Sequence, residues 1–218
     1  MKRRTIDLVA SAGGLLLAAI LLVGGLVLTS NANFAKNYVH DQMVQQQITF
    51  TALENLSEEE KAEACLVEYA GQLMTTGKQA ECYANHYIGL HLKNMGAGTP
   101  YEGLSYSAIG GAQTELKAQI TAATEAGDTA KVTELNATLT KLNGQRDTVF
   151  KGEMLRGVLL TSYGFSELGA KAGQGATVAY IGAGLFFLLS ILGFWHAART
   201  PRDKAFAAVE SGREKVAA

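Results

Sequence analysis

The chain has 218 residues, a net charge of −1 and charged side chains at 18% of its positions. This balance, with no run of lysines or arginines, gives no reason to expect nucleic acid as a partner. The average conceals two stretches without any charge, residues 8–35 and 172–198 (with His196 counted as neutral), so nearly all the charge lies elsewhere.

Each uncharged stretch contains an apolar segment long enough to cross a bilayer, at residues 8–29 and 177–196. A crossing needs about 20 apolar residues in a helix, and a helix is the only form in which a single segment satisfies its own backbone in lipid. We therefore predict an all-α membrane protein with two transmembrane helices.

The first segment has a second interpretation, because it follows three basic residues and precedes a small-x-small pattern, Ser30-Asn31-Ala32, as a secretory signal would. The apolar part of a signal peptide usually spans about 7–15 residues. The segment at 8–29 is longer, which favours a retained signal anchor.

Basic residues gather at the outer ends of the two apolar segments: Lys2, Arg3, Arg4, Arg199, Arg202 and Lys204. The inner ends carry only Lys36 and Lys171. The positive-inside rule then places residues 1–7 and the tail 197–218 in the cytoplasm, and residues 30–175 outside the plasma (inner) membrane.

Small residues four positions apart indicate where the two spans would pack: Gly14 and Ala18 in the first, Ala179 and Ala183 in the second. The alternative is that small residues are simply common in membrane helices. With His196 counted as neutral, neither span contains a charged side chain, which argues against a proton or ion path within this chain alone.

The region between the spans is predicted to be helical. Residues 48–50 are predicted to be extended. Ser57 and Glu60 form a capping-box pattern, and the apolar stripe after it predicts a helix that ends at Gly77. A second helix is expected over 78–94, ended by Gly96, Gly98 and Pro100, so that the two helices form a hairpin.

The two cysteines, Cys65 and Cys82, lie on opposite arms of this predicted hairpin. Antiparallel arms would bring them level, and the compartment outside the membrane is oxidising. We predict a disulfide that stabilises a small helical domain with a modest core.

Residues 112–143 carry two narrow apolar seams with heptad-like spacing, separated by Gly127 and Asp128, of which Asp128 is placed to cap the second helix. This pattern predicts an antiparallel coiled-coil arm.

A last helix is expected over 145–168, followed by a flexible entry, 169–175, into the second span. One side of that helix is expected to carry Phe150, Met154, Val158 and Leu159.

Few residues occur in a pattern that is typical of a catalytic or metal-binding site. Cys82 and His86 are four apart and could hold a metal with His91 or Glu81, but two ligands do not make a site, and the disulfide competes for the cysteine. Nucleotide-binding, hydrolase, zinc-protease and haem-attachment motifs do not occur. We expect no catalytic, cofactor-binding or metal-binding residues, and no enzyme.

Two tracts, CYANHYIGLHLKNMGAGTPYEGLSY (82–106) and FKGEMLRGVLLTSYGFSELG (150–169), carry a family likeness. With them the chain resembles uncharacterised two-span membrane proteins of actinobacteria, in which a similar helix runs into a glycine-rich turn and another precedes the second span. The resemblance implies the topology and a bacterial source, but no activity. The arm at 112–143 departs from the family pattern.

The leading functional hypothesis is a non-catalytic accessory or scaffold subunit of a larger bacterial membrane complex, of the respiratory or transport type. Its partners would be other membrane-protein subunits and the lipid bilayer. One alternative is an extracytoplasmic sensor or ligand-binding protein that relies on a partner for its output. Another is a homo-oligomeric channel, which the uncharged spans disfavour.

Overall fold

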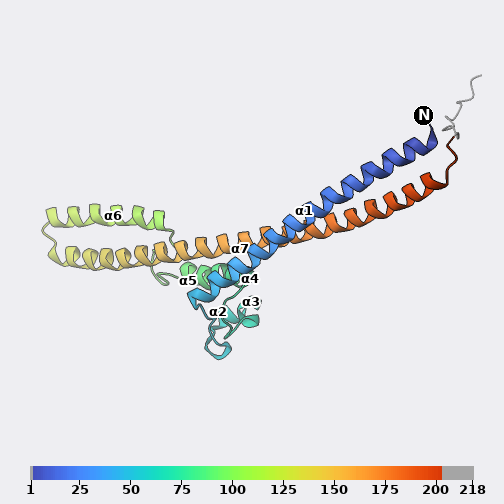
Figure 1. Ribbon diagram of the computed structural model, residues 1–218. Helices are drawn as coiled ribbons and strands as arrows, with labels where there is room; N and C mark the ends of the chain where they lie inside the picture. Colours follow the sequence, from blue (N-terminus) through green and yellow to red (C-terminus); the bar gives the residue numbers. More distant parts are fainter. Residues whose placement is uncertain (1, 203–218) are drawn as a thin grey trace, which may run out of the picture. The chain divides into compact units, whose positions relative to one another are not determined.

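A computed structural model describes residues 2–202 of the chain, and in this part the structure is helical without a β-strand (Figure 1). An antiparallel bridge joins Thr49 to Leu73. The chain divides into two compact units, which are described separately: one holds the residues up to Phe34 and those from Gly169, the other is Ala35–Leu168. Lys204 and the tail beyond residue 202 lie outside the described residues.

The first unit consists of the beginning of α1 (Arg3–Gln46) and the end of α7 (Thr129–Arg199), which lie side by side and antiparallel (Figure 1). Both are long and apolar enough to span a membrane, with mean hydropathies of 2.4 and 2.0 in their most apolar windows. Only 11% of each window is buried, whereas a core helix of a soluble protein would be mostly buried. The prediction of two apolar helices with the length of membrane spans is confirmed.

The expected breaks in the last part of the chain are absent, because α7 continues from Thr129 to Arg199 as one helix of 71 residues. The predicted flexible entry at 169–175 is therefore wrong. Glycine costs only about 0.5–1 kcal/mol relative to alanine inside a helix, and at 173 and 175 it faces α1 at van der Waals contact distances. A Cβ on Gly173 would lie 3.7 Å from Cβ of Ala32, and one on Gly175 would lie 3.4 Å from Cδ1 of Leu28.

In the second unit the capping box is confirmed, since Ser57 and Glu60 bond each other's backbone N–H groups at 3.2 and 2.7 Å. The long helix predicted after it is wrong. A 3-10 turn, η1 (Leu53–Asn55), precedes two short helices, α2 (Glu58–Lys61) and α3 (Ala64–Glu68). They are separated by Glu63, whose backbone is extended (φ −89°, ψ 100°).

Tertiary hydrogen bonds replace the missing helical turns after α3. Gly71 adopts a φ of 71°, and the chain then runs back along residues 48–50. The N–H of Phe50 donates to the Gln72 carbonyl (2.9 Å), and the N–H of Met74 donates to the Ile48 carbonyl (2.8 Å). The extended conformation predicted for residues 48–50 agrees with this pairing, whereas the two-helix hairpin predicted for the region does not.

The second predicted helix exists as a continuous run of α4 (Gly77–Cys82), the π-helix η2 (Tyr83–Ile88) and α5 (Gly89–Lys93). Gly77 begins this run, whereas we expected it to end the helix before. The reason is a second capping box, in which Thr76 and Gln79 bond each other's backbone.

The run ends where the sequence predicts, since Gly96 and Gly98 have φ values of 78° and 75°, which glycine adopts without a steric penalty.

A helical hairpin occupies the region of the predicted arm, with α6 (Tyr106–Glu125) lying beside the first part of α7 (Figure 1). Gly127 turns the chain with a φ of 70°, and Asp128 caps α7 by accepting the N–H of Lys131 at 2.9 Å. The buried seam of the hairpin contains Ile109, Leu116, Leu135, Leu142 and Val149. The hairpin begins before residue 112, and its coiled-coil character stays a prediction.

The main core of the second unit joins the end of α1, the α2–α5 region and the middle of α7. Its completely or almost completely buried members are Met43, Leu66, Met74, Ala80, Cys82, Ala84 and Leu159. The side of α7 predicted from the sequence is split by this packing. Leu159 is fully buried, whereas Phe150, Met154 and Val158 are 48%, 55% and 50% exposed.

Candidate functional site

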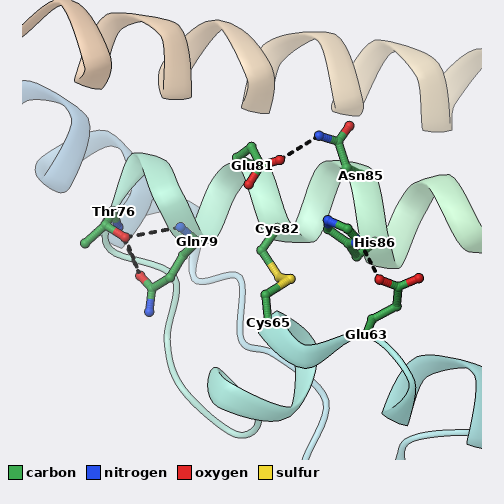
Figure 2. Close-up of a disulfide and its surroundings, with 8 residues drawn as sticks. All are labelled: Glu63, Cys65, Thr76, Gln79, Glu81, Cys82, Asn85 and His86. Atoms are coloured by element: carbon green, nitrogen blue, oxygen red, sulfur yellow. Dashed lines mark hydrogen bonds and ion pairs between the residues drawn. A yellow bond between two sulfur atoms is a disulfide. The ribbon is translucent and has the colours of Figure 1, made fainter.

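The predicted disulfide is confirmed: Cys65 in α3 and Cys82 at the end of α4 are joined by an S–S bond of 2.00 Å (Figure 2). The two cysteines are 17 residues apart in the sequence, and Cys82 is almost completely buried. The bond attaches a five-residue helix, α3, to the longer helical run on which the core is built. Because the sulfur of Cys82 is bonded to Cys65, it is not free to ligate a metal.

Two histidine–carboxylate pairs connect the same segments. Nδ1 of His86 lies 2.6 Å from Oε2 of Glu63 (Figure 2), and Nε2 of His91 lies 3.4 Å from Oε1 of Glu60. The carboxylate of Glu81 accepts instead from the side-chain amide of Asn85. Within residues 2–202 no three potential ligands gather into a metal site. The pairs therefore act as ties between α2–α3 and η2–α5.

A ladder of rings follows the π-helix. Tyr83 stacks on Tyr87 with ring centres 4.6 Å apart, Tyr87 meets the ring of His91 edge-on at 4.4 Å, and Phe50 meets Tyr83 at 5.3 Å. Burial, with a smaller contribution from Tyr87, raises the pKa of the Tyr83 hydroxyl above its usual value of 10. A π-turn often marks a functional site, but here it places rings in a packed core.

A groove of about 600 Å³ runs between α1 and α7 within the second unit. Its lining is mainly apolar, and Tyr38, Met154 and Val158 on it are about half exposed. Tyr38 contacts Phe165 edge-on across the groove at 5.8 Å between ring centres. The groove is lined by Tyr38, Val39, Gln42, Met43, Gln46, Glu153, Met154, Gly157, Val158, Thr161, Ser162 and Phe165. Large apolar side chains left exposed in this way are typical of an interaction surface.

A second, smaller pocket of about 290 Å³ lies at the base of the α6–α7 hairpin, lined by Tyr106, Gln113, Asn143, Arg146, Asp147 and Phe150. None of its polar members stands out as a site residue in the sequence. They lie on a hairpin that the sequence predicts as a polar arm, and nothing in their spacing indicates that they meet.

The packing residues predicted for the spans lie at different depths in the first unit. Ala18 and Ala183 are 6% and 7% exposed, and Ala179 is partly buried. Gly14 faces the other helix, because a Cβ there would lie 2.5 Å from Oγ of Ser190. Gly14, Ala18 and Ala183 thus lie in or beside the interface between the two apolar helices.

Two contacts in that interface were not predicted. A Cβ on Gly25 would lie 2.7 Å from Cε1 of Tyr180, so the tyrosine ring lies against the glycine backbone. The hydroxyl of the same tyrosine hydrogen-bonds the Thr29 hydroxyl at 2.9 Å. The Thr29 hydroxyl thus gives the Tyr180 hydroxyl a hydrogen-bond partner between two otherwise apolar helices.

Comparison with protein-family models, with curated proteins and with solved structures yields no match to the chain. The resemblance to the actinobacterial two-span family therefore stays a prediction.

Proposed function

We propose that the chain is a non-catalytic accessory or scaffold subunit of a larger bacterial membrane complex, of the respiratory or transport type, and that another subunit covers the groove on α1 and α7. The observation that supports this is the exposure of Tyr38, Met154 and Val158 in parts of the two helices beyond the apolar segments. Outside lipid these side chains would meet water, and burying them against a protein surface is favourable by roughly 25 cal/mol per Å².

The lining of the groove suggests what kind of partner fits it. Its polar members are mostly uncharged, such as Gln42 and Ser162, and its one carboxylate, Glu153, is already paired with Arg156 at 3.0 Å. An amphipathic helix, with an apolar stripe and neutral polar flanks, matches such a groove. We propose a helix of a neighbouring subunit as the occupant.

The proposed topology has spans at 8–29 and 177–196, both termini in the cytoplasm and the domain at 30–175 outside the plasma membrane. The basic residues at the outer ends of the spans support it. The disulfide supports it independently, since disulfides persist in oxidising compartments. Alkaline phosphatase, which needs disulfides to be active, should be active when inserted at Gly127 and inactive when fused after the second span; the reverse result contradicts the topology.

Copurification from native membranes in mild detergent tests the proposed function. The wild-type chain should carry other membrane subunits with it. Met154→Glu and Val158→Glu place a charge in the groove and should remove those subunits. Leu155→Glu is the matched control, because Leu155 is 38% exposed on the same helix but does not line the groove. A wild-type chain that purifies alone contradicts the proposal, as does equal loss of subunits in all three variants.

A further inference from the structure

Arg146, in the pocket at the base of the α6–α7 hairpin, carries a positive charge that forms no ion pair with a carboxylate in the described part of the chain. Its neighbour Asp147 pairs with Lys151 at 2.6 Å instead. The guanidinium makes one hydrogen bond, from Nη1 to Oε1 of Gln113 at 3.2 Å. Its Nε is buried without a hydrogen-bond partner, the one such side-chain nitrogen or oxygen between residues 2 and 202.

The surroundings hold this guanidinium in place. The ring of Tyr106 lies 4.1 Å from its central carbon, an arrangement in which the ring face attracts the cation. Gln113 is 7% exposed, and its amide donates to Oδ1 of Asn143 at 2.7 Å, which fixes the oxygen that Arg146 contacts. The donors of the arginine are therefore oriented in advance, which lowers the entropic cost of binding an anion.

A structural role alone accounts for only part of this arrangement. The bond between Gln113 and Asn143 already provides a buried polar contact that can fix the register of two helices. The contact between Gln113 and Asn143 needs no charged side chain next to it. Partial burial of an arginine without an acidic partner is unfavourable, and an anion in the pocket would remove that cost.

The pocket next to the guanidinium suggests the ligand's chemistry. Its volume of about 290 Å³ is suited to a small molecule, and two rings, those of Tyr106 and Phe150, line it together with the polar groups. The planar fork of an arginine matches a carboxylate. The negative charge of Asp147 in the same lining disfavours a second acidic group on the ligand.

We propose that this pocket binds a small organic monocarboxylate, with the carboxylate on Arg146 and an aromatic or apolar body against Tyr106 and Phe150. The pocket shares no residue with the groove on α1 and α7. The inference therefore goes beyond the accessory role and does not depend on it, and it gives a physical basis to ligand binding by this region.

The test uses the full chain in lipid nanodiscs and 4-fluorobenzoate as the probe, observed by fluorine NMR. Saturable broadening of the probe signal, above that with empty nanodiscs, is expected at millimolar concentrations. Unlabelled benzoate should reverse it, whereas benzamide, which has the same shape without the charge, should not. Broadening that does not saturate, or that benzamide reverses equally well, overturns the proposal.

Variants identify the site. Arg146→Gln should weaken binding at least about tenfold, equivalent to about 1.4 kcal/mol, whereas Lys141→Gln removes the same charge from an exposed position of α7 and should have no effect. Should Arg146→Gln fail to fold, Phe150→Ala serves instead, because its ring lines the pocket beside Tyr106 and is 48% exposed. Phe150→Ala should lower the affinity for 4-fluorobenzoate several-fold. Unchanged binding in a folded Arg146→Gln variant or in Phe150→Ala overturns the assignment.

Discussion

The imidazole of His86 lies 2.6 Å from the carboxylate of Glu63, and the two residues belong to the same chain segments that the Cys65–Cys82 disulfide joins. Isolated helices as short as α2 and α3 are unstable in water. In this domain α2 and α3 are held in position by contacts with the α4–α5 run. These contacts are the disulfide, the His86–Glu63 pair and the His91–Glu60 pair.

Removing the disulfide should destabilise this domain substantially. The bond closes a loop of 17 residues, and restricting a loop of that size in the unfolded chain contributes about 3 kcal/mol. Replacement of both cysteines by serine should lower the free energy of unfolding by about 2–4 kcal/mol, measured by urea denaturation of the purified chain. A reducing agent should destabilise the wild type equally and leave the double variant unchanged. Equal stability with and without the bond contradicts the prediction.

The histidine pair should contribute less than the disulfide but measurably. His86→Ala should cost about 0.5–1.5 kcal/mol, since it removes a hydrogen bond from a partly buried carboxylate. His40→Ala is the control: that histidine pairs only with the adjacent Asp41, and both side chains are more than half exposed. It should change stability little. Similar effects of the two substitutions would show that the His86–Glu63 tie does not support the domain.

How far the sequence predicted this structure depended on whether the signal was local. The capping pattern of Ser57 and Glu60, the role of Asp128 and the uncharged spans are local features, and each appears in the structure. The disulfide followed from two cysteines placed on segments expected to lie together. The segments did lie together, but not as the two regular helices that we expected.

The errors arose where tertiary contacts decide the local conformation. Glu63 interrupts the helix predicted from residue 57 and pairs with His86, 23 positions away. Glycines 173 and 175 stay helical although each costs about 0.5–1 kcal/mol relative to alanine, and both face α1 at van der Waals contact distances. The pocket around Arg146 depends on the register of α6 against α7, which the spacing of apolar residues does not specify for polar side chains.

Titration of Tyr83 should make stability depend on pH at the alkaline end. Burial raises its pKa in the folded state above the unfolded value of about 10, so the folded state binds the proton more tightly. The resulting stabilisation is complete below pH 10 and is lost as the pH rises through the folded pKa. Urea denaturation can be measured between about pH 9 and 11, on either side of the unfolded pKa. As the pH rises, Tyr83→Phe should lose less stability than the wild type. An identical slope for both proteins contradicts the assignment.

Neighbouring glycines in α1 should differ sharply in their tolerance of a side chain. A Cβ on Gly25 meets the ring of Tyr180, and one on Gly14 meets Ser190, whereas Gly24 and Gly13 have open space around the Cβ position. Gly25→Val and Gly14→Val should each cost about 1–3 kcal/mol through overpacking. The matched Gly24→Val and Gly13→Val should not. The midpoint of unfolding in mixtures of SDS and mild detergent measures the difference, and equal midpoints for the paired variants would argue against this helix interface.

Whether a helix of another subunit occupies the groove on α1 and α7 is tested most directly by photo-cross-linking in the cells that produce the protein. A photoreactive phenylalanine analogue replaces Val158, which lines the groove, or Leu155, which does not. We expect a cross-linked product with a different membrane protein at position 158 and a much weaker one at position 155. No product at position 158, or only a product with a second copy of this chain, would contradict it.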